Sequence, residues 1–312
     1  MDAAAPPDVG AALRARGYAV VRGVLSADDV AAVKERLRHL AAHAGRYRHL
    51  GVHFHPDPAV VPRGDGDPLA RFEQIGNAPF LDPTIRARLL AHPALVRLAA
   101  ALLGPDLHVI NAGFFVKPAH GGAEVPWHQD AATWGIPPGA WTPADAPPIF
   151  DFWLALDPTD RGNGCLELLP GSERRGIVPH TRRGRLLPEA DPAACGLDPA
   201  RAVALPAAPG DLVVYHQDTF HRSDTNRSDR PRLAAAGTLV GARDLARLRA
   251  LLPGLETLAR PPLVRAGRPV ALADPLPAYP ACWRVAWRRL VRYGSARRSR
   301  LRSRRARSQS RA

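Results

Sequence analysis

The hydrophobic and polar positions divide the chain into a mainly helical first part and a later part made of short strands. Residues 18–25, YAVVRGVL, have the apolar, β-branched composition of a strand. A helix is predicted over residues 27–43, because Ser26 and Asp29 form an S-x-x-D capping box and the following apolar residues recur every three or four positions. A second helical stretch, 83–104, is interrupted by a proline and ends at a glycine.

A loop rich in His, Pro and Gly is predicted over residues 45–68, and from residue 107 the pattern changes to short strands. The segments with strand character are 107–118, 149–157, 165–171, 201–206, 211–216 and 232–241. Asn-Gly and Pro-Gly pairs between these segments mark turns. Helices followed by a run of short strands predict a β-sandwich or barrel with helices packed outside it.

The positive charge of the chain is concentrated at its C-terminal end. The formal net charge is +14 at pH 7, and residues 275–312 hold 12 arginines and no acidic residue. When those 12 are subtracted from the 43 Lys and Arg, the remaining 31 face all 29 Asp and Glu, so residues 1–274 carry about +2. We therefore expect a domain over residues 1–252, a Pro-rich segment over 253–281 and an Arg-rich, disordered tail over 282–312.

Composition argues against several classes of protein. Hydrophobic residues make up 46% of the chain, as in a globular protein, but no apolar run approaches the roughly 20 residues of a membrane span. The first residues lack the basic start and apolar stretch of a secretory signal. The three cysteines lie far apart and offer neither a disulfide framework nor a zinc site. We expect a cytoplasmic protein, and the sequence leaves its oligomeric state open.

The triplet H-x-D occurs three times and is the first candidate for chemistry. A histidine and an aspartate two residues apart on a strand point to the same side. With a second histidine, they form the ligand set of a non-haem Fe(II) oxygenase. His55-Pro56-Asp57 has a proline between the two residues and lies in a predicted loop. His216-Gln217-Asp218 lies at the end of a predicted strand and is interpreted as a polar pair without a metal.

The third pair, His128 and Asp130, has the most suitable surroundings. It follows a predicted strand after a glycine turn, and His221 comes 91 residues after Asp130, just past another strand. Arg232 lies 11 residues further on and begins the next strand. From that position on the neighbouring strand, its guanidinium could lie beside the metal and bind a dicarboxylate through paired hydrogen bonds.

Five sequence stretches, in order between residues 11 and 241, resemble the phytanoyl-CoA dioxygenase family of Fe(II)/2-oxoglutarate oxygenases. They are GYAVVRGVLS, FFVKPAHGGAEVPWHQD, WLALDPTDRGNGCLELLPGS, PGDLVVYH and HRSDTNRSDRPR. The resemblance implies a mostly β fold with flanking helices, whose core is a double-stranded β-helix, a cupin-like jelly roll, from about residue 105 to 241. It also implies that His128, Asp130 and His221 hold Fe(II).

By the same resemblance, Arg232 pairs with the distal carboxylate of 2-oxoglutarate, and Gln129, Trp153 and Ser223 line the co-substrate pocket. Trp153 has the alternative of ordinary core packing, and Ser223 that of capping a turn. The family tends to use an upstream lysine on the co-substrate. The corresponding stretch here, RFEQIG, offers Gln74 instead.

The activity implied by the resemblance is hydroxylation of a small molecule, in which O2 and 2-oxoglutarate are consumed and succinate and CO2 are released. A carboxylate at Asp130 favours hydroxylation, because related halogenases have a small apolar residue there. Desaturation or cyclisation at the same site is the nearest alternative. An alternative of a different class is a binder of nucleic acid or anionic surfaces through the Arg-rich tail. That tail has no aromatic residue after Tyr293 for base stacking.

Overall fold

The helices lie mainly in the N-terminal third, where the sequence carries its helical pattern. The computed structural model describes residues 8–48, 51–57, 66–181, 187–252 and 262–271. Within them the helices are α1 (Val9–Arg16), α2 (Ala27–Ala42), α3 (Ala44–Arg48), α4 (Ala78–Leu81), α5 (Pro83–Ile85), α6 (Pro93–Leu103), α7 (Asp130–Thr133) and α8 (Ala242–Leu251).

Both predicted helical stretches form, and local side chains explain where they begin and end. The Ser26 hydroxyl accepts a hydrogen bond from the N–H of Asp29 at 3.1 Å, so α2 has the predicted N-cap. The stretch 83–104 is divided by a π-helical turn at Arg86–Leu90, and α6 then begins at a proline. Gly104 ends α6 with a positive φ of 90°.

The strands form two antiparallel sheets. They are β1 (Tyr18–Val21), β2 (His53–Pro56), β3 (Phe72–Gly76), β4 (Leu107–Lys117), β5 (Val125–His128), β6 (Ile149–Ala155), β7 (Leu166–Leu168), β8 (Val203–Leu205), β9 (Leu212–Tyr215), β10 (His221–Ser223), β11 (Arg232–Gly241), β12 (Val264–Arg265) and β13 (Arg268–Pro269). The major sheet has the order β1-β9-β6-β11-β4-β12-β13, with β3 also paired to β4 and β2 to β3. The minor sheet has the order β5-β10-β7-β8.

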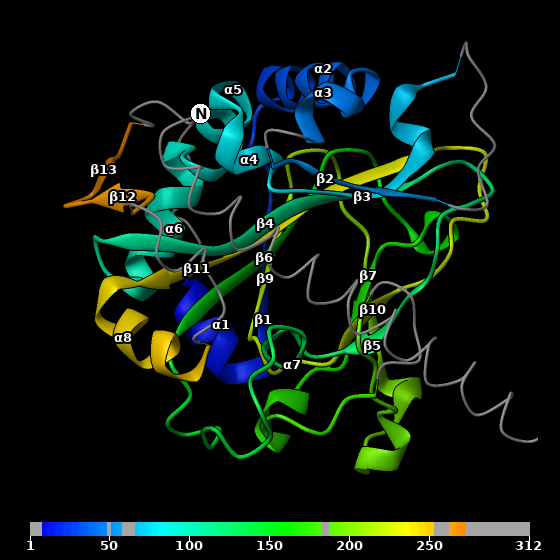
Figure 1. The fold of residues 1–312 in the computed structure, drawn as a ribbon. Helices are drawn as coiled ribbons and strands as arrows, with labels where there is room; N and C mark the ends of the chain where they lie inside the picture. Colours follow the sequence, from blue (N-terminus) through cyan, green and yellow to red (C-terminus); the bar gives the residue numbers. More distant parts are fainter. Residues whose placement is uncertain (1–7, 49–50, 58–65, 182–186, 253–261, 272–312) are drawn as a thin grey trace, which may run out of the picture. The chain divides into compact units, whose positions relative to one another are not determined.

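The major sheet is covered on both faces, and β6 shows how. All seven of its residues are buried. Phe150, Phe152 and Leu154 belong to the core formed with the N-terminal helices. Trp153 and Ala155 face the other way and pack with apolar residues of the minor sheet. In Figure 1, β5, β7 and β10 accordingly lie to the right of β6 and β9 of the major sheet, and helices α1, α6 and α8 to their left. The predicted mostly β fold, a double-stranded β-helix with flanking helices, is confirmed.

The structure also contains strands that the sequence pattern did not predict. The segment 45–68, predicted as a loop, contains β2, and β3 follows it. The strands β5 and β10 are four and three residues long, too short to show an alternating pattern. These four strands matter for function, because all of them border the pocket described below.

The segment predicted to be a Pro-rich extension is partly built into the fold. Within it, Leu263 and Val264 are fully buried, and Val264 pairs with Leu107 of β4. The compact unit accordingly extends to Val270, beyond the predicted boundary at residue 252. The predicted Arg-rich tail lies outside the described residues. None of the described helices is long and apolar enough to cross a bilayer.

Candidate metal centre

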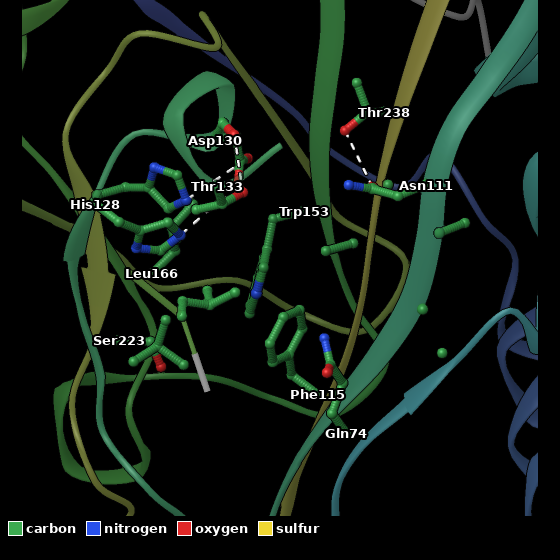
Figure 2. Close-up of a pocket in the computed structure, with 18 of the residues that line it drawn as sticks. Gln74, Asn111, Phe115, His128, Asp130, Thr133, Trp153, Leu166, Ser223 and Thr238 are labelled. Carbon is green, nitrogen blue, oxygen red and sulfur yellow. Dashed lines mark hydrogen bonds and ion pairs between the residues drawn. The ribbon is translucent and has the colours of Figure 1, made fainter. Parts of the chain in front are cut away.

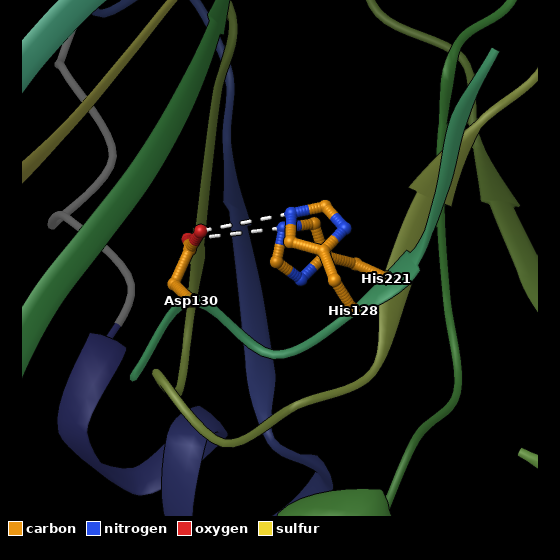
Figure 3. Close-up of side chains that lie close together, drawn as sticks. All are labelled: His128, Asp130 and His221. Carbon is orange, nitrogen blue, oxygen red and sulfur yellow. Dashed lines mark ion pairs between the residues drawn. The ribbon is translucent and has the colours of Figure 1, made fainter. Parts of the chain in front are cut away.

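His128, Asp130 and His221 come together at one point, although they lie on three different elements. His128 ends β5, His221 begins β10, and the two residues are direct partners across this antiparallel pair. Their rings therefore stand side by side, with centroids 4.1 Å apart. Asp130 lies at the start of α7. Its Oδ1 is 3.7 Å from Nε2 of His128, and its Oδ2 is 3.7 Å from Nε2 of His221. The three ligand atoms lie within 4.8 Å of one another (Figure 3).

Both imidazoles are oriented by the carbonyl groups behind them. Nδ1 of His128 lies 2.7 Å from the carbonyl of Pro126, and Nδ1 of His221 lies 3.0 Å from that of Thr219. A carbonyl only accepts, so each Nδ1 carries a proton and each ring turns its Nε2 toward the centre. Burial and the neighbouring His221 keep the pKa of His128 well below its usual value. The arrangement therefore suits a cation.

Tyr215 and His180 support this centre, and no sequence pattern singled out either residue. The Tyr215 hydroxyl donates to Oδ2 of Asp130 at 3.0 Å. Burial and the adjacent carboxylate hold the pKa of Tyr215 well above 10, so the phenol remains a donor. His180 places Nδ1 2.9 Å from the carbonyl of Val178, and its Nε2 accepts from the N–H of Gln129 at 3.0 Å. His180 thus anchors the backbone between the two ligands of the H-x-D pair.

Gln129 lies elsewhere than the resemblance implied. Its side chain is fully buried, donates to the carbonyls of Gly176 and Asp218, and accepts from the N–H of Val178. It is not among the described residues that line the pocket. The cause is local geometry. His128 is the last residue of a strand, so the side chain that follows it points away from the side on which the ligands converge.

Within the described residues, the other two H-x-D pairs belong to no cluster able to hold a metal. Asp218 donates its N–H to Nδ1 of His216 and accepts from the indole of Trp141, as expected for a polar pair. Burial raises the pKa of Asp218 to about 6 and lowers that of His216 to about 4. At neutral pH His216 is therefore neutral, whereas Asp218 becomes neutral only in mild acid. His55 lies on β2 and lines the pocket. In the described residues, the triad is the one cluster of three His, Cys, Asp or Glu residues able to hold a metal.

Arg232 is buried beside the centre with part of its hydrogen-bonding capacity unused. It is 1% exposed, and its Nη2 donates to the carbonyl of Gly164 at 3.0 Å and to the hydroxyl of Ser223 at 2.7 Å. Nε and Nη1 have no partner among the described residues. Burial lowers its pKa to about 10, so the guanidinium is still charged at neutral pH. A buried positive charge with unused hydrogen-bond donors is suited to binding an anionic ligand.

One pocket joins the triad to Arg232 (Figure 2). It has a volume of about 220 Å³, and Trp153, Ser223 and Gln74 line it. Trp153 also packs in the core between the sheets, so it is a core residue and a pocket-lining residue at once. Its ring centroid lies 5.9 Å from the guanidinium carbon of Arg232.

Lys117 is the direct strand partner of Arg232, yet it does not line the pocket. Its ammonium donates to the carbonyls of Ala123, Ser223 and Asp224 at 2.7, 3.0 and 2.6 Å. Those three bonds use all its protons. Lys117 therefore ties the segment before β5 to the end of β10. Gln74, in contrast, does line the pocket.

Comparisons with known proteins agree with this geometry. The family model described as phytanoyl-CoA dioxygenase (PhyH) matches residues 13–234. L-proline trans-4-hydroxylase of Streptomyces griseoviridis is 43% identical over 97 residues, which cover 31% of this chain and 35% of that protein. Phytanoyl-CoA dioxygenase domain-containing protein 1 of Mus musculus is 26% identical, covering 72% of this chain and 88% of its own length. The crystal structure of EvdO2 from Micromonospora carbonacea, complexed with 2-oxoglutarate, is 26% identical with a TM-score of 0.53, covering 78% of this chain and 93% of that chain.

Proposed function

The chain belongs to the phytanoyl-CoA dioxygenase family, and from that premise we propose that it is an Fe(II)- and 2-oxoglutarate-dependent dioxygenase that hydroxylates a C–H bond of a small molecule. One oxygen atom of O2 enters the product and the other enters succinate, which forms with CO2 from 2-oxoglutarate. The observation that carries the proposal is that two imidazoles, one carboxylate and one incompletely paired arginine border the same pocket.

The donor set fits a ferrous ion. Two histidine nitrogens and one carboxylate oxygen from His128, Asp130 and His221 leave the remaining coordination positions for co-substrate and oxygen. When bound, the iron supplies the activation of O2 that the side chains cannot provide. Tyr215 and His180 keep the carboxylate and the H-x-D backbone in place.

The opposite side of the pocket fits the far carboxylate of 2-oxoglutarate. Arg232 is the cation that would hold it, because its Nε and Nη1 have no partner among the described residues. Ser223 accepts from Nη2 of the same guanidinium and donates to the carbonyl of Gly164, which fixes the plane of the fork. Trp153 forms a wall beside it. With Lys117 fully engaged by carbonyls, Arg232 is the charge that would anchor the co-substrate.

We also propose a cytoplasmic location, which is supported by Cys165 and Cys195, both present as free thiols in the described residues.

The metal and co-substrate assignment of the proposed function can be tested by binding measurements. The anaerobic protein should bind one Fe(II) per chain, and 2-oxoglutarate should then give a weak visible charge-transfer band. His221→Ala should abolish both. His216→Ala is the matched control, because His216 lies on the same segment but contacts Asp218 and not the triad. A band that persists in His221→Ala but disappears in His216→Ala would show that the ligand assignment is wrong.

A further inference from the structure

A row of three polar side chains crosses the centre of the major sheet on the pocket side. Asn111 of β4 is the direct partner of Thr238 of β11, and Thr238 is the partner of Asp151 of β6. The Thr238 hydroxyl lies 3.1 Å from Oδ1 of Asn111 and also contacts Oδ1 of Asp151. Asn111 and Thr238 line the pocket. In Figure 2 they lie across Trp153 from Ser223, so they belong to the end that the co-substrate would leave open.

The number of protons shared by these three side chains determines which of them donates each hydrogen bond. A threonine hydroxyl has one proton, so it can donate to Asn111 or to Asp151 but not to both. Asp151 is fully buried, and its Oδ2 has no hydrogen-bond partner among the described residues. An amide oxygen carries no proton, so when the Thr238 hydroxyl donates to Oδ1 of Asn111, its contact with Oδ1 of Asp151 requires a proton on that carboxyl. Burial shifts the pKa of Asp151 in the matching direction, above its usual value. A protonated Asp151 donates to Thr238, and Thr238 then donates to Asn111.

This direction leaves the amide nitrogen of Asn111 as the group that faces the pocket. Asn111 is exposed although it lies in the middle of a central strand. Its Oδ1 is occupied by Thr238, so its two N–H groups can bind an acceptor on a ligand.

The charges around the pocket favour the same kind of ligand. Among the described lining residues, Asp130 is the one carboxylate, and the proposed function assigns it to the metal. Arg222 and His55 also line the pocket, but Arg222 pairs with Glu167 at 2.9 Å and burial lowers the pKa of His55, so neither adds a free positive charge. A cationic group would thus find no free carboxylate in the described lining.

We propose that Asn111 is a substrate-recognition residue that donates its amide N–H to a carbonyl or carboxylate oxygen of a neutral or anionic substrate, with Thr238 and Asp151 as positioning residues. The proposal rests on the proposed function, because it identifies this end of the pocket as the substrate side.

The test uses the side-chain amide of Asn111 as a direct probe. The chain has four asparagines, at positions 77, 111, 163 and 226, so selective ¹⁵N-Asn labelling gives a simple spectrum. The full chain is loaded with Zn(II), which is diamagnetic, and with saturating 2-oxoglutarate, which occupies Arg232. Asn111→Ser identifies the Asn111 signal by its loss. Acetate and methylammonium are then titrated separately at equal ionic strength.

Acetate should move the Asn111 amide signal saturably, and methylammonium should leave it in place. In Thr238→Val the amide loses its orientation, and the apparent acetate affinity should fall about three- to tenfold. Thr238→Ser should restore it. Movement with methylammonium in place of acetate would mean that the oxygen of Asn111 faces the pocket, and would overturn the proposal. So would an Asn111 signal that responds to neither ion. Fe(II) and 2-oxoglutarate binding, measured by the charge-transfer band, would show separately whether the proposed function fails.

Discussion

Arg232 is the residue on which 2-oxoglutarate binding should depend most. Removing one partner of a buried ion pair costs about 3–5 kcal/mol, and each 1.4 kcal/mol is roughly tenfold in affinity. Arg232→Ala should therefore weaken 2-oxoglutarate binding at least ~100-fold. Iron binding should survive, because the guanidinium bonds to Gly164 and Ser223 and not to the triad. Arg232→Lys should recover only part, since an ammonium cannot make paired bonds.

Arg230 is the matched control for this prediction. It lies two residues earlier, is half exposed, and pairs with Asp160 at 2.6 Å on the surface. Surface pairs contribute about 0–1 kcal/mol, so Arg230→Ala should change co-substrate affinity only slightly. The measurement is a titration of the charge-transfer band with 2-oxoglutarate. Unchanged affinity in Arg232→Ala, or a larger loss in Arg230→Ala, would contradict the assignment of Arg232.

His180 should control metal affinity without touching the metal. Its Nε2 accepts from the backbone N–H between His128 and Asp130, and it holds that backbone in place. Loss of a residue that orients metal ligands typically costs 10–100-fold in metal affinity. We expect His180→Ala to weaken Fe(II) binding by about this factor in anaerobic calorimetry. His216→Ala, at another partly buried histidine, should leave Fe(II) affinity unchanged. Equal Fe(II) affinity in His180→Ala and the native chain would show that this contact does not position the ligands.

Asp218 should make the metal-free protein more stable in mild acid. Burial raises its pKa from 3.8 to about 6. Below pH 4 the carboxyl is protonated in both the folded and the unfolded chain. Between pH 4 and 6 the unfolded chain ionises and the folded chain does not, so stability falls by up to about 3 kcal/mol and then levels off.

Asp218→Asn should remove this part of the pH dependence. The amide oxygen can still accept from the indole of Trp141. The variant should therefore gain stability over the native protein at pH 7 but not at pH 4. Urea denaturation at the two pH values checks this, and an equal difference at both would indicate that Asp218 is not protonated in the fold.

At the scale of elements, the turn between β6 and β7 links strand geometry to co-substrate binding. Gly164 has a φ of 76°, and a Cβ there would lie 2.2 Å from the carbonyl oxygen of Asp224. Its own carbonyl accepts from Arg232 and from Ser223. Gly164→Ala should consequently displace the turn, destabilise the protein and also weaken 2-oxoglutarate binding.

Gly171 provides the control for Gly164. Its φ is 80°, nearly the same, but no atom lies within 4 Å of the position of its Cβ. Gly171→Ala should cost about 1–2 kcal/mol from the left-handed backbone alone and leave co-substrate affinity unchanged. Thermal unfolding and the band titration together separate the two effects. Equal results for the two variants would mean that the close approach to Asp224 has no consequence.

At the scale of the whole molecule, the charge distribution predicts that binding of small molecules and binding of polyanions are separable. Residues 282–312 hold all 12 of the C-terminal arginines, and the compact unit ends at Val270. Deleting residues 282–312 should leave Fe(II) and 2-oxoglutarate binding intact. It should also reduce salt-sensitive retention on immobilised DNA, because each arginine lost removes a phosphate contact. A soluble truncated chain that no longer binds 2-oxoglutarate would show that the tail belongs to the catalytic fold.

The sequence by itself determined the residues whose position follows from short spacing. Asp130 follows His128 by two residues at the end of a strand, so the two side chains lie on the same side. Arg232 begins the strand β11, which brings it close to the metal centre. The order of helices and strands likewise predicted the fold class. The resemblance implied that Gln129 lines the co-substrate pocket, and this prediction was wrong. The alternation of side chains along an extended segment predicts instead that Gln129 points away from His128 and Asp130.

Only the tertiary structure decided which distant residues support the site. Tyr215, His180 and the row of Asn111, Thr238 and Asp151 meet through the register of strands and loops that are far apart in the chain. Register depends on how whole strands pack, and a shift by one residue would turn each side chain to the opposite face. The same reason explains Lys117, whose role is set by three carbonyls brought to it by two other segments.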